Sequence, residues 1–101
     1  MVIYSPLIGN TLKIGGTDTS VDTALPTTDS CTYNCLKLEA VTNLFHYRLG
    51  PAGGTAVVDT DAFITTTAPH FVSVSPATQT NIQCTGAAGS LYVTPCMVSK
   101  V

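Results

Sequence analysis

Cysteine, histidine and aspartate are the side chains in this sequence whose types and spacing could do chemistry. The four cysteines are Cys31, Cys35, Cys84 and Cys96. Only the first two are close in sequence, which is unlike the paired short knuckles of a structural zinc site. Reduced cysteines in the core or at a sheet edge are the first expectation, and one or two disulfides are the second. If disulfides form, a Cys35–Cys96 link is as reasonable as a Cys31–Cys35 link, and the sequence does not choose between them.

The remaining groups with catalytic potential are two histidines and a pair of aspartates. His46 shares the polar face of a predicted strand with Arg48, and His70 follows a turn, so neither is placed as the base of a nucleophile pair. Asp59 and Asp61 are two residues apart, so their carboxylates could point the same way, as the two carboxylates of a glycosidase do. A turn between strands uses the same spacing for its own hydrogen bonds. We therefore expect no enzyme activity, no catalytic residue, no cofactor and no metal.

The segment from residue 35 to 50 is where hydrophobic alternation and turn chemistry agree best. It predicts two strands, one with its alternation over residues 36–40 and one with its alternation over residues 45–49, joined as an antiparallel hairpin by the short connection at residues 41–43. The side chains expected on the inward faces are Leu36, Leu38, Ala40, Phe45, Tyr47 and Leu49, and those expected to face outward are Lys37, Glu39, His46 and Arg48.

Further strands are predicted along the rest of the chain. Residues 71–75 alternate cleanly, and residues 82–85 are expected to pair with 91–94 as a second hairpin across the glycines of 86–89. Strands at roughly 8–12-residue spacing describe an all-β protein, a small antiparallel β-sandwich or barrel, with no βαβ pattern.

Charged residues are unusually scarce in this chain, at 10% against about 25% in typical soluble proteins, while threonine occurs 17 times. Few charges remove the usual guard against association at strand edges and apolar patches, so much of the surface is expected to be covered by partners; a threonine-rich secreted monomer is the alternative. Four scattered basic residues and a net charge of −2 argue against nucleic acid as a partner. The apolar runs are far shorter than the ~20 residues that span a bilayer, and no secretory signal is visible, so no membrane partner and synthesis in the cytoplasm are expected.

The first 30 residues are expected to differ from the rest. We predict an N-terminal arm or edge hairpin followed by a long polar connection in residues 1–30, and a β-sandwich domain in residues 31–101. Pro6 restricts its strand to an edge or an arm. One hypothesis is an arm that docks on a neighbouring subunit, so that deletion of residues 1–14 leaves the domain folded; the other is an ordinary edge hairpin of the same domain. The candidate docking residues are Ile3, Tyr4, Leu7, Ile8, Leu12 and Ile14.

Four short segments, in this order, are similar to those of small virion structural proteins of tailed bacteriophages. The matching segments are 47–50 (YRLG), 60–63 (TDAF), 68–72 (APHFV) and 89–95 (GSLYVTP), so the likeness covers roughly the last two-thirds of the chain. The chain departs from that pattern at His70 and Cys96, where glycine is usual. This resemblance is one of fold positions and includes no catalytic motif.

The resemblance implies a β-sandwich that serves as a capsid decoration or cement protein. Its partners would be the major capsid protein and copies of itself, with a trimer as the first expectation, and it would lie on the capsid exterior of the virion after synthesis in the host cytoplasm. The alternative function is a glycan- or receptor-binding β-module of a phage fibre or tail, with loops 50–55 and 75–81 as the contacting surface.

Overall fold

The computed structural model describes residues 2–6, 11–17, 19–26, 33–54, 62–75 and 78–100, and it contains strands but no helix within them. Residues 2–6 and 98–100 are described by their backbone alone. In chain order the strands are β1 Val2–Pro6, β2 Leu12–Gly15, β3 Val21–Ala24, β4 Cys35–Val41, β5 Phe45–Gly50, β6 Ala62–Ile64, β7 His70–Ser73, β8 Asn81–Thr85 and β9 Ser90–Lys100.

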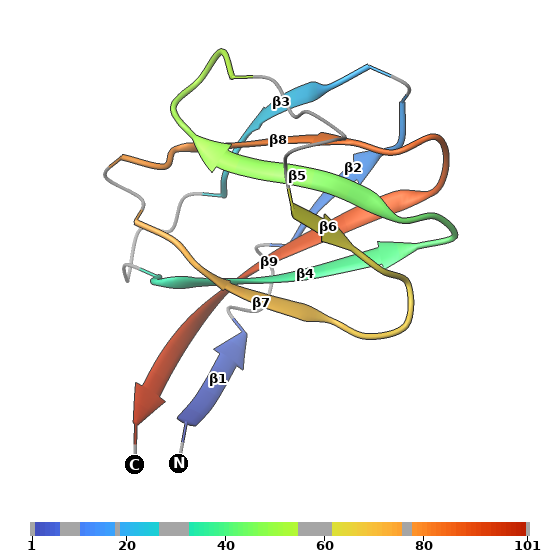
Figure 1. Cartoon of the computed structure of the whole chain (residues 1–101). Helices are drawn as coiled ribbons and strands as arrows, with labels where there is room; N and C mark the ends of the chain where they lie inside the picture. Colours follow the sequence, from blue (N-terminus) through green and yellow to red (C-terminus); the bar gives the residue numbers. More distant parts are fainter. Residues whose placement is uncertain are drawn as a thin grey trace.

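The strands form two antiparallel sheets that pack face to face. Sheet A has the order β1-β9-β4-β7, with β2 also paired to β9, and sheet B has the order β3-β8-β5-β6. Figure 1 shows β5 and β8 of sheet B lying over β4 and β9 of sheet A. From β2 to β9, every connection except that between β5 and β6 crosses from one sheet to the other.

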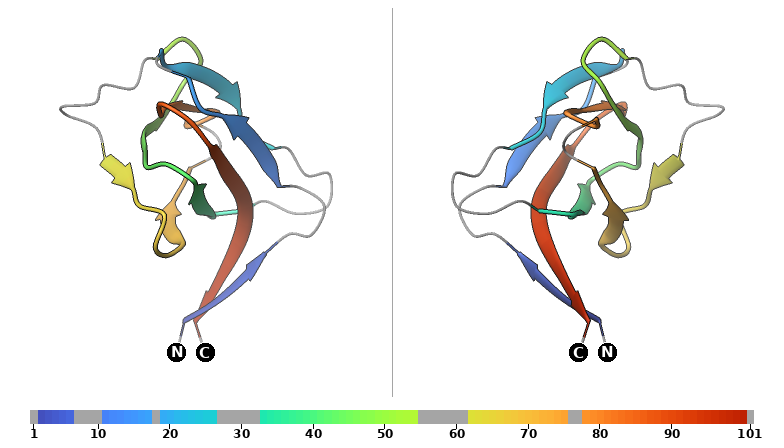
Figure 2. Two further views of the ribbon diagram at one scale, coloured as in Figure 1. Left: turned by 90° about the vertical axis from the view of Figure 1, so that its right-hand side faces the viewer. Right: turned by 90° about the vertical axis from the view of Figure 1, so that its left-hand side faces the viewer.

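Strands β2 to β9 therefore have the strand order of a jelly roll, in which two four-stranded rows are built from Greek-key connections. The side views in Figure 2 show the two layers, and the core residues pack between them. The all-β sandwich predicted from the sequence is confirmed.

The core includes the inward faces that the alternation predicted. Leu36 and Leu38 of β4 and Phe45 of β5 are fully buried, and burying each such side chain contributes roughly 1.5–3 kcal/mol relative to exposure. On the other face of β4, the Lys37 ammonium and the Glu39 carboxylate form an ion pair of 3.3 Å. Alternation thus assigned the two faces of this strand correctly.

The 35–50 segment contains the two predicted strands, but it is not a hairpin. β4 pairs with β9 and β7 in sheet A, whereas β5 pairs with β8 and β6 in sheet B. The connection at 42–44 passes between the sheets, with Thr42 in the left-handed region at a φ of 79°. The prediction was wrong because alternation shows which side chains are buried, and a hairpin buries the same side chains as two strands on opposite walls of one core.

The second predicted hairpin is wrong for the same reason. β8 belongs to sheet B and β9 to sheet A, and Ile82 and Leu91 are fully buried on opposite walls of the core. Gly89 has a φ of 79° in this connection, and a Cβ there would collide with the carbonyl oxygen of Val41. Glycine is therefore required both by the turn and by the close approach of the β4–β5 connection.

The predicted boundary at residue 30 does not separate an arm from a domain. β2 pairs with β9, with Ile14 opposite Leu91, and β3 pairs with β8, with Val21 opposite Cys84. The expected long polar connection thus contains a strand of sheet B. Its four residues, Val-Asp-Thr-Ala, carry too little apolar alternation to be distinguished from a loop.

β1 and β2 do not pair with each other, so the predicted N-terminal hairpin is also wrong. Both strands pair with β9, β2 along residues 90–93 and β1 along residues 96–100. Pro95 lies in the interval between these two partners, where a missing backbone N–H breaks no ladder to β1 or β2. Pro6 ends β1, whose pairing in the described part of the chain is with β9 alone, as expected of a strand at an edge.

Candidate docking surface

β9 extends beyond the end of the sandwich. Its pairing with β4 ends at Cys96, opposite Cys35, and from there to Lys100 its partner is β1, whose Pro6 lies opposite Cys96. Figures 1 and 2 show β1 and the end of β9 leaving the sandwich side by side, with both ends of the chain at the tip. We call this two-stranded projection, Val2–Pro6 with Cys96–Lys100, the ribbon.

Both outer edges of the ribbon lack a further strand in the part of the chain that the structure describes. A strand edge of this kind presents a row of backbone N–H and C=O groups that can pair with an extended segment of another chain. Proteins usually guard such edges with charged residues, but Lys100 is the one charged side chain in the ribbon sequence. The ribbon can therefore add strands at its edges.

The two strands of the ribbon are paired in an antiparallel register over its whole length. Tyr4 lies opposite Val98, Ser5 lies opposite Met97, and Pro6 lies opposite Cys96.

The structure describes four of the six predicted docking residues, and they belong to two different strands, β1 and β2. Ile3 and Tyr4 lie on the ribbon, and Leu7 and Ile8 lie outside the described residues. Leu12 is half-buried and packs against the core, and Ile14 is only 5% exposed within it. Ile14 was therefore wrongly predicted to be available for docking, because β2 adds its inward face to the sandwich.

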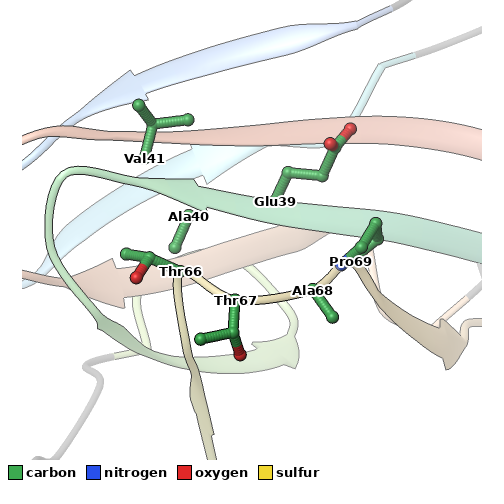
Figure 3. A pocket seen from close by; sticks show the side chains of 7 residues that line it. All are labelled: Glu39, Ala40, Val41, Thr66, Thr67, Ala68 and Pro69. Carbon is green, nitrogen blue, oxygen red and sulfur yellow. The ribbon is translucent and has the colours of Figure 1, made fainter.

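A pocket of about 260 Å³ lies at the opposite edge of sheet A. β7 pairs with β4 only as far as Leu38, opposite His70, so residues 39–41 of β4 have no strand on that side among the described residues. Figure 3 shows the chain at Thr66–Pro69 running beside this free end of β4. The pocket is lined by Glu39, Ala40, Val41, Thr66, Thr67, Ala68 and Pro69, a lining without aromatic rings.

Several large apolar side chains are exposed around this pocket and on the neighbouring strands. Val41 and Leu44 lie at the β4–β5 connection, Phe63 lies on β6 and Phe71 on β7. Phe63 is the most exposed of them at 57%, and its ring lies 5.9 Å from that of His46. Single exposed apolar residues are common on protein surfaces. These side chains are therefore weaker evidence for a contact area than an open strand edge is.

A polar cluster on sheet B ties the β5–β6 loop to the sheet. The Asp22 carboxylate accepts hydrogen bonds from the Gly53 N–H at 2.8 Å, from Gln83 Nε2 at 2.6 Å and from Asn81 Nδ2 at 3.2 Å. These bonds, with the Gly53 bond the largest contributor, lower the pKa of Asp22 below its ordinary value of 3.8. Part of the loop predicted to contact glycans is thus held against the sheet.

Gln83 is the residue of this cluster that the sequence did not single out. Its side chain is fully buried, its Nε2 also donates to the Pro51 carbonyl at 3.2 Å, and its Oε1 has no partner among the described groups. A Cβ at Gly54 would approach that Oε1 to 2.9 Å, so glycine allows the loop to lie directly on the amide. A glutamine between apolar strand residues was the available signal.

The groups with catalytic potential are dispersed. His46 lies on β5, and His70 lies on β7 with its ring 6.1 Å from that of Tyr47. Asp59 and Asp61 lie outside the described residues. Within the residues that the structure describes, no three His, Cys, Asp or Glu side chains gather as a metal ion would require.

Of the four cysteines, Cys35, Cys84 and Cys96 are free and buried, and Cys31 lies outside the described residues. Burial raises the pKa of the Cys84 thiol to about 11. Burial also raises the pKa of Cys35, and the neighbouring Cys96 adds to that shift. Thiols with raised pKa values are weak nucleophiles at neutral pH.

Comparison of the chain with protein-family models, with curated proteins and with solved structures finds no match. In the described part of the chain, no helix is long and apolar enough to span a bilayer.

Proposed function

We propose that this chain is a non-enzymatic virion structural protein, a decoration or cement protein on the capsid exterior that docks through its ribbon. The observation that carries the proposal is the ribbon itself. It projects from the sandwich, and neither of its outer edges is paired with a further strand in the described part of the chain. A two-stranded ribbon in water is marginally stable at best. It gains most when a neighbour supplies the missing strand.

The rest of the molecule supports this role. The jelly-roll order of β2 to β9 occurs in viral capsid domains, although this likeness of fold alone also fits other functions. The low charge of the chain, 10% of residues, leaves little electrostatic repulsion to oppose close packing of many copies. The partners in this proposal are the major capsid protein and further copies of the chain.

Purified particles provide the direct test of this function. Particles from cells that produce the protein should contain it in high copy number by mass spectrometry and retain it through a density gradient. A chain that lacks residues 1–6 should remain folded by circular dichroism but dissociate from the particles, because one strand of the ribbon is lost. Absence of the intact protein from the particles would refute the proposal.

Phe63→Ser is the matched control for that truncation. It removes the most exposed large apolar side chain of the sandwich and leaves the ribbon intact, so binding to particles should persist. Loss of binding with Phe63→Ser, and not with the truncation, would move the docking surface to the β6 side of the molecule.

Self-association of the free chain is a further part of the proposal, with a trimer as the expected state. Subunits on icosahedral shells commonly occupy threefold positions, and this argument comes from symmetry and not from particular residues. Equilibrium sedimentation at micromolar concentration should give three times the chain mass. A single species with the mass of one chain would show that the free protein is not a trimer.

The second candidate function is glycan or receptor binding, and the pocket beside β4 favours it. Its lining includes the hydroxyl groups of Thr66 and Thr67 and the carboxylate of Glu39, which could hydrogen-bond to a sugar. It lacks the aromatic platform on which a sugar ring usually stacks. Titration of the folded chain with host-surface glycans tests this function, and Thr67→Val should abolish any affinity that depends on the pocket.

A further inference from the structure

Cys35 and Cys96 occupy a special place in sheet A. They lie directly opposite each other as the last residue pair between β4 and β9, and Cys96 is also opposite Pro6 of β1. The pair therefore marks the root of the ribbon, where β9 exchanges β4 for β1 as its partner. A covalent bond between these two residues would fix the point at which the ribbon leaves the sandwich.

The register brings the two cysteines within the range of a disulfide. Directly opposed residues of an antiparallel pair have Cα atoms about 4.5–5.5 Å apart, and a disulfide accepts about 4.4–6.8 Å. Leu36, the next residue in β4, points into the core, so Cys35 and Cys96 share the outer face of sheet A. Both side chains are nevertheless sealed from solvent, at 3% and 0% exposure.

The electrostatics of the pair agree with this proximity. The pKa of the Cys35 thiol is raised first by burial and then by the charge of Cys96, which acts only when the two groups are close. Burial likewise raises the pKa of Cys96, against the opposing effects of the Lys37 backbone N–H and its ammonium group. Cys84, in contrast, lies in the main core of the sandwich opposite Tyr47 and Val21.

We propose that Cys35 and Cys96 are a disulfide-forming pair that clasps the root of the ribbon to β4. The oxidant is a small-molecule disulfide such as oxidised glutathione. When the root of the ribbon opens and exposes the pair to solvent, one cysteine thiolate attacks this oxidant, forms a mixed disulfide and releases one thiol. The second cysteine then attacks the mixed disulfide, the Cys35–Cys96 bond forms, and the second thiol leaves. The two protons and two electrons of the cysteines thus end on two molecules of reduced thiol.

The clasp has a defined consequence for the ribbon. The bond would prevent β9 from separating from β4 at Cys96, so that fluctuations of the ribbon no longer propagate into the sandwich. It would also close a long loop of the chain, from residue 35 to residue 96, and long loops gain most from a cross-link in the chain-entropy account. This inference does not depend on the virion role.

A tryptic digest of the oxidised chain distinguishes the possible disulfides. The chain is equilibrated with oxidised glutathione, its free thiols are alkylated, and it is then digested. Lys13, Lys37, Arg48 and Lys100 are the cleavage sites, so Cys31 and Cys35 fall in peptide 14–37, and Cys84 and Cys96 in peptide 49–100. A Cys35–Cys96 bond links these two peptides, whereas Cys31–Cys35 and Cys84–Cys96 bonds each stay within one of them.

Variants assign the bond within the linked peptides. Cys31→Ser and Cys84→Ala should each retain the link, and Cys96→Ser should lose it, with folding checked by circular dichroism. In the Cys31→Ser chain, oxidation should raise the thermal midpoint by roughly 10 °C or more, reversibly with a reducing agent. Amide exchange beside the bond, at residues 36–38 and 92–94, should slow at least tenfold.

Two results would overturn the proposal. One is a bond that stays within peptide 14–37 of the wild-type chain, which would make Cys31 the partner of Cys35. The other is a folded Cys31→Ser chain that remains fully reduced under the same oxidation. The wild-type digest needs no substitution, so a bond confined to peptide 14–37 overturns the proposal even if a variant fails to fold.

Discussion

The two halves of β9 form one continuous strand in two different environments. Residues 90–93 lie between β2 and β4, and Leu91 and Val93 are fully buried against sheet B. Residues 97–100 have β1 as their described partner. The same strand is thus part of the core at one end and part of a projecting ribbon at the other. A single long strand can in this way join a stable sandwich to an element that is available to partners.

The largest expected effect on stability is in residues 90–93, the half of β9 that lies between β2 and β4. Leu91→Ala should lower the free energy of unfolding by about 2–5 kcal/mol, because it leaves a cavity where a fully buried side chain packed. Leu44→Ala makes the same chemical change at a side chain that is 44% exposed and should cost less than about 1 kcal/mol. Urea denaturation measures both, and equal losses would contradict the assignment of Leu91 to the core.

The start of β9 should be nearly as sensitive. Gly89→Ala should cost at least about 2 kcal/mol, since it combines left-handed backbone strain with a collision against the Val41 carbonyl. Gly53→Ala is the matched control, because Gly53 has a φ of 94° but nothing within 4 Å of the position that an added methyl group would take. It should show the strain alone, about 1–2 kcal/mol. A smaller loss at Gly89 than at Gly53 would contradict the close approach.

The ribbon half should contribute little to the stability of the isolated chain. Removal of residues 1–6 should lower the thermal midpoint by only a few degrees, because the sandwich retains β2 to β9. Removal of residues 1–14, which the arm hypothesis expects the domain to survive, should be much more damaging because it deletes β2 and the buried Ile14. Amide exchange should be faster at residues 97–99 than at 91–94. Equal protection of the amides from exchange along the whole of β9 would contradict the distinction between its two halves.

The sequence predicted the strands and their faces better than it predicted their partners. Alternation placed Leu36, Leu38 and Phe45 in the core correctly. It could not tell a hairpin from two strands on opposite walls, because the buried set is the same in both. The short turns at 42–44 and 86–89 are compatible with either arrangement, and only long-range pairing decides between them.

The ribbon was predicted only in part. Pro6 correctly indicated an edge strand, but no strand was predicted over residues 96–100. Pro95 lies opposite Leu36 of β4, in the interval between the β2 and β1 pairings, and this placement depends on a register that no local pattern contains. The opposition of Cys35 and Cys96 depends on the same register, so the sequence left it as one of two possible disulfides.

The smallest expected effect lies away from β9, in the polar cluster of sheet B, and it depends on pH. The hydrogen bond from Gly53, followed by that from Gln83, lowers the pKa of Asp22 in the folded chain. A lowered folded pKa means that the ionised carboxylate stabilises the fold above the unfolded pKa, and that this contribution is lost as pH falls from about 4 through the folded value. Asp22→Asn should be less stable than the wild type at pH 7, and the gap should narrow at acidic pH. Urea midpoints measured across this range test the prediction, and the narrowing should persist in high salt because it comes from short hydrogen bonds. A gap that stays constant with pH would show that the Asp22 carboxylate does not hold the β5–β6 loop on the sheet.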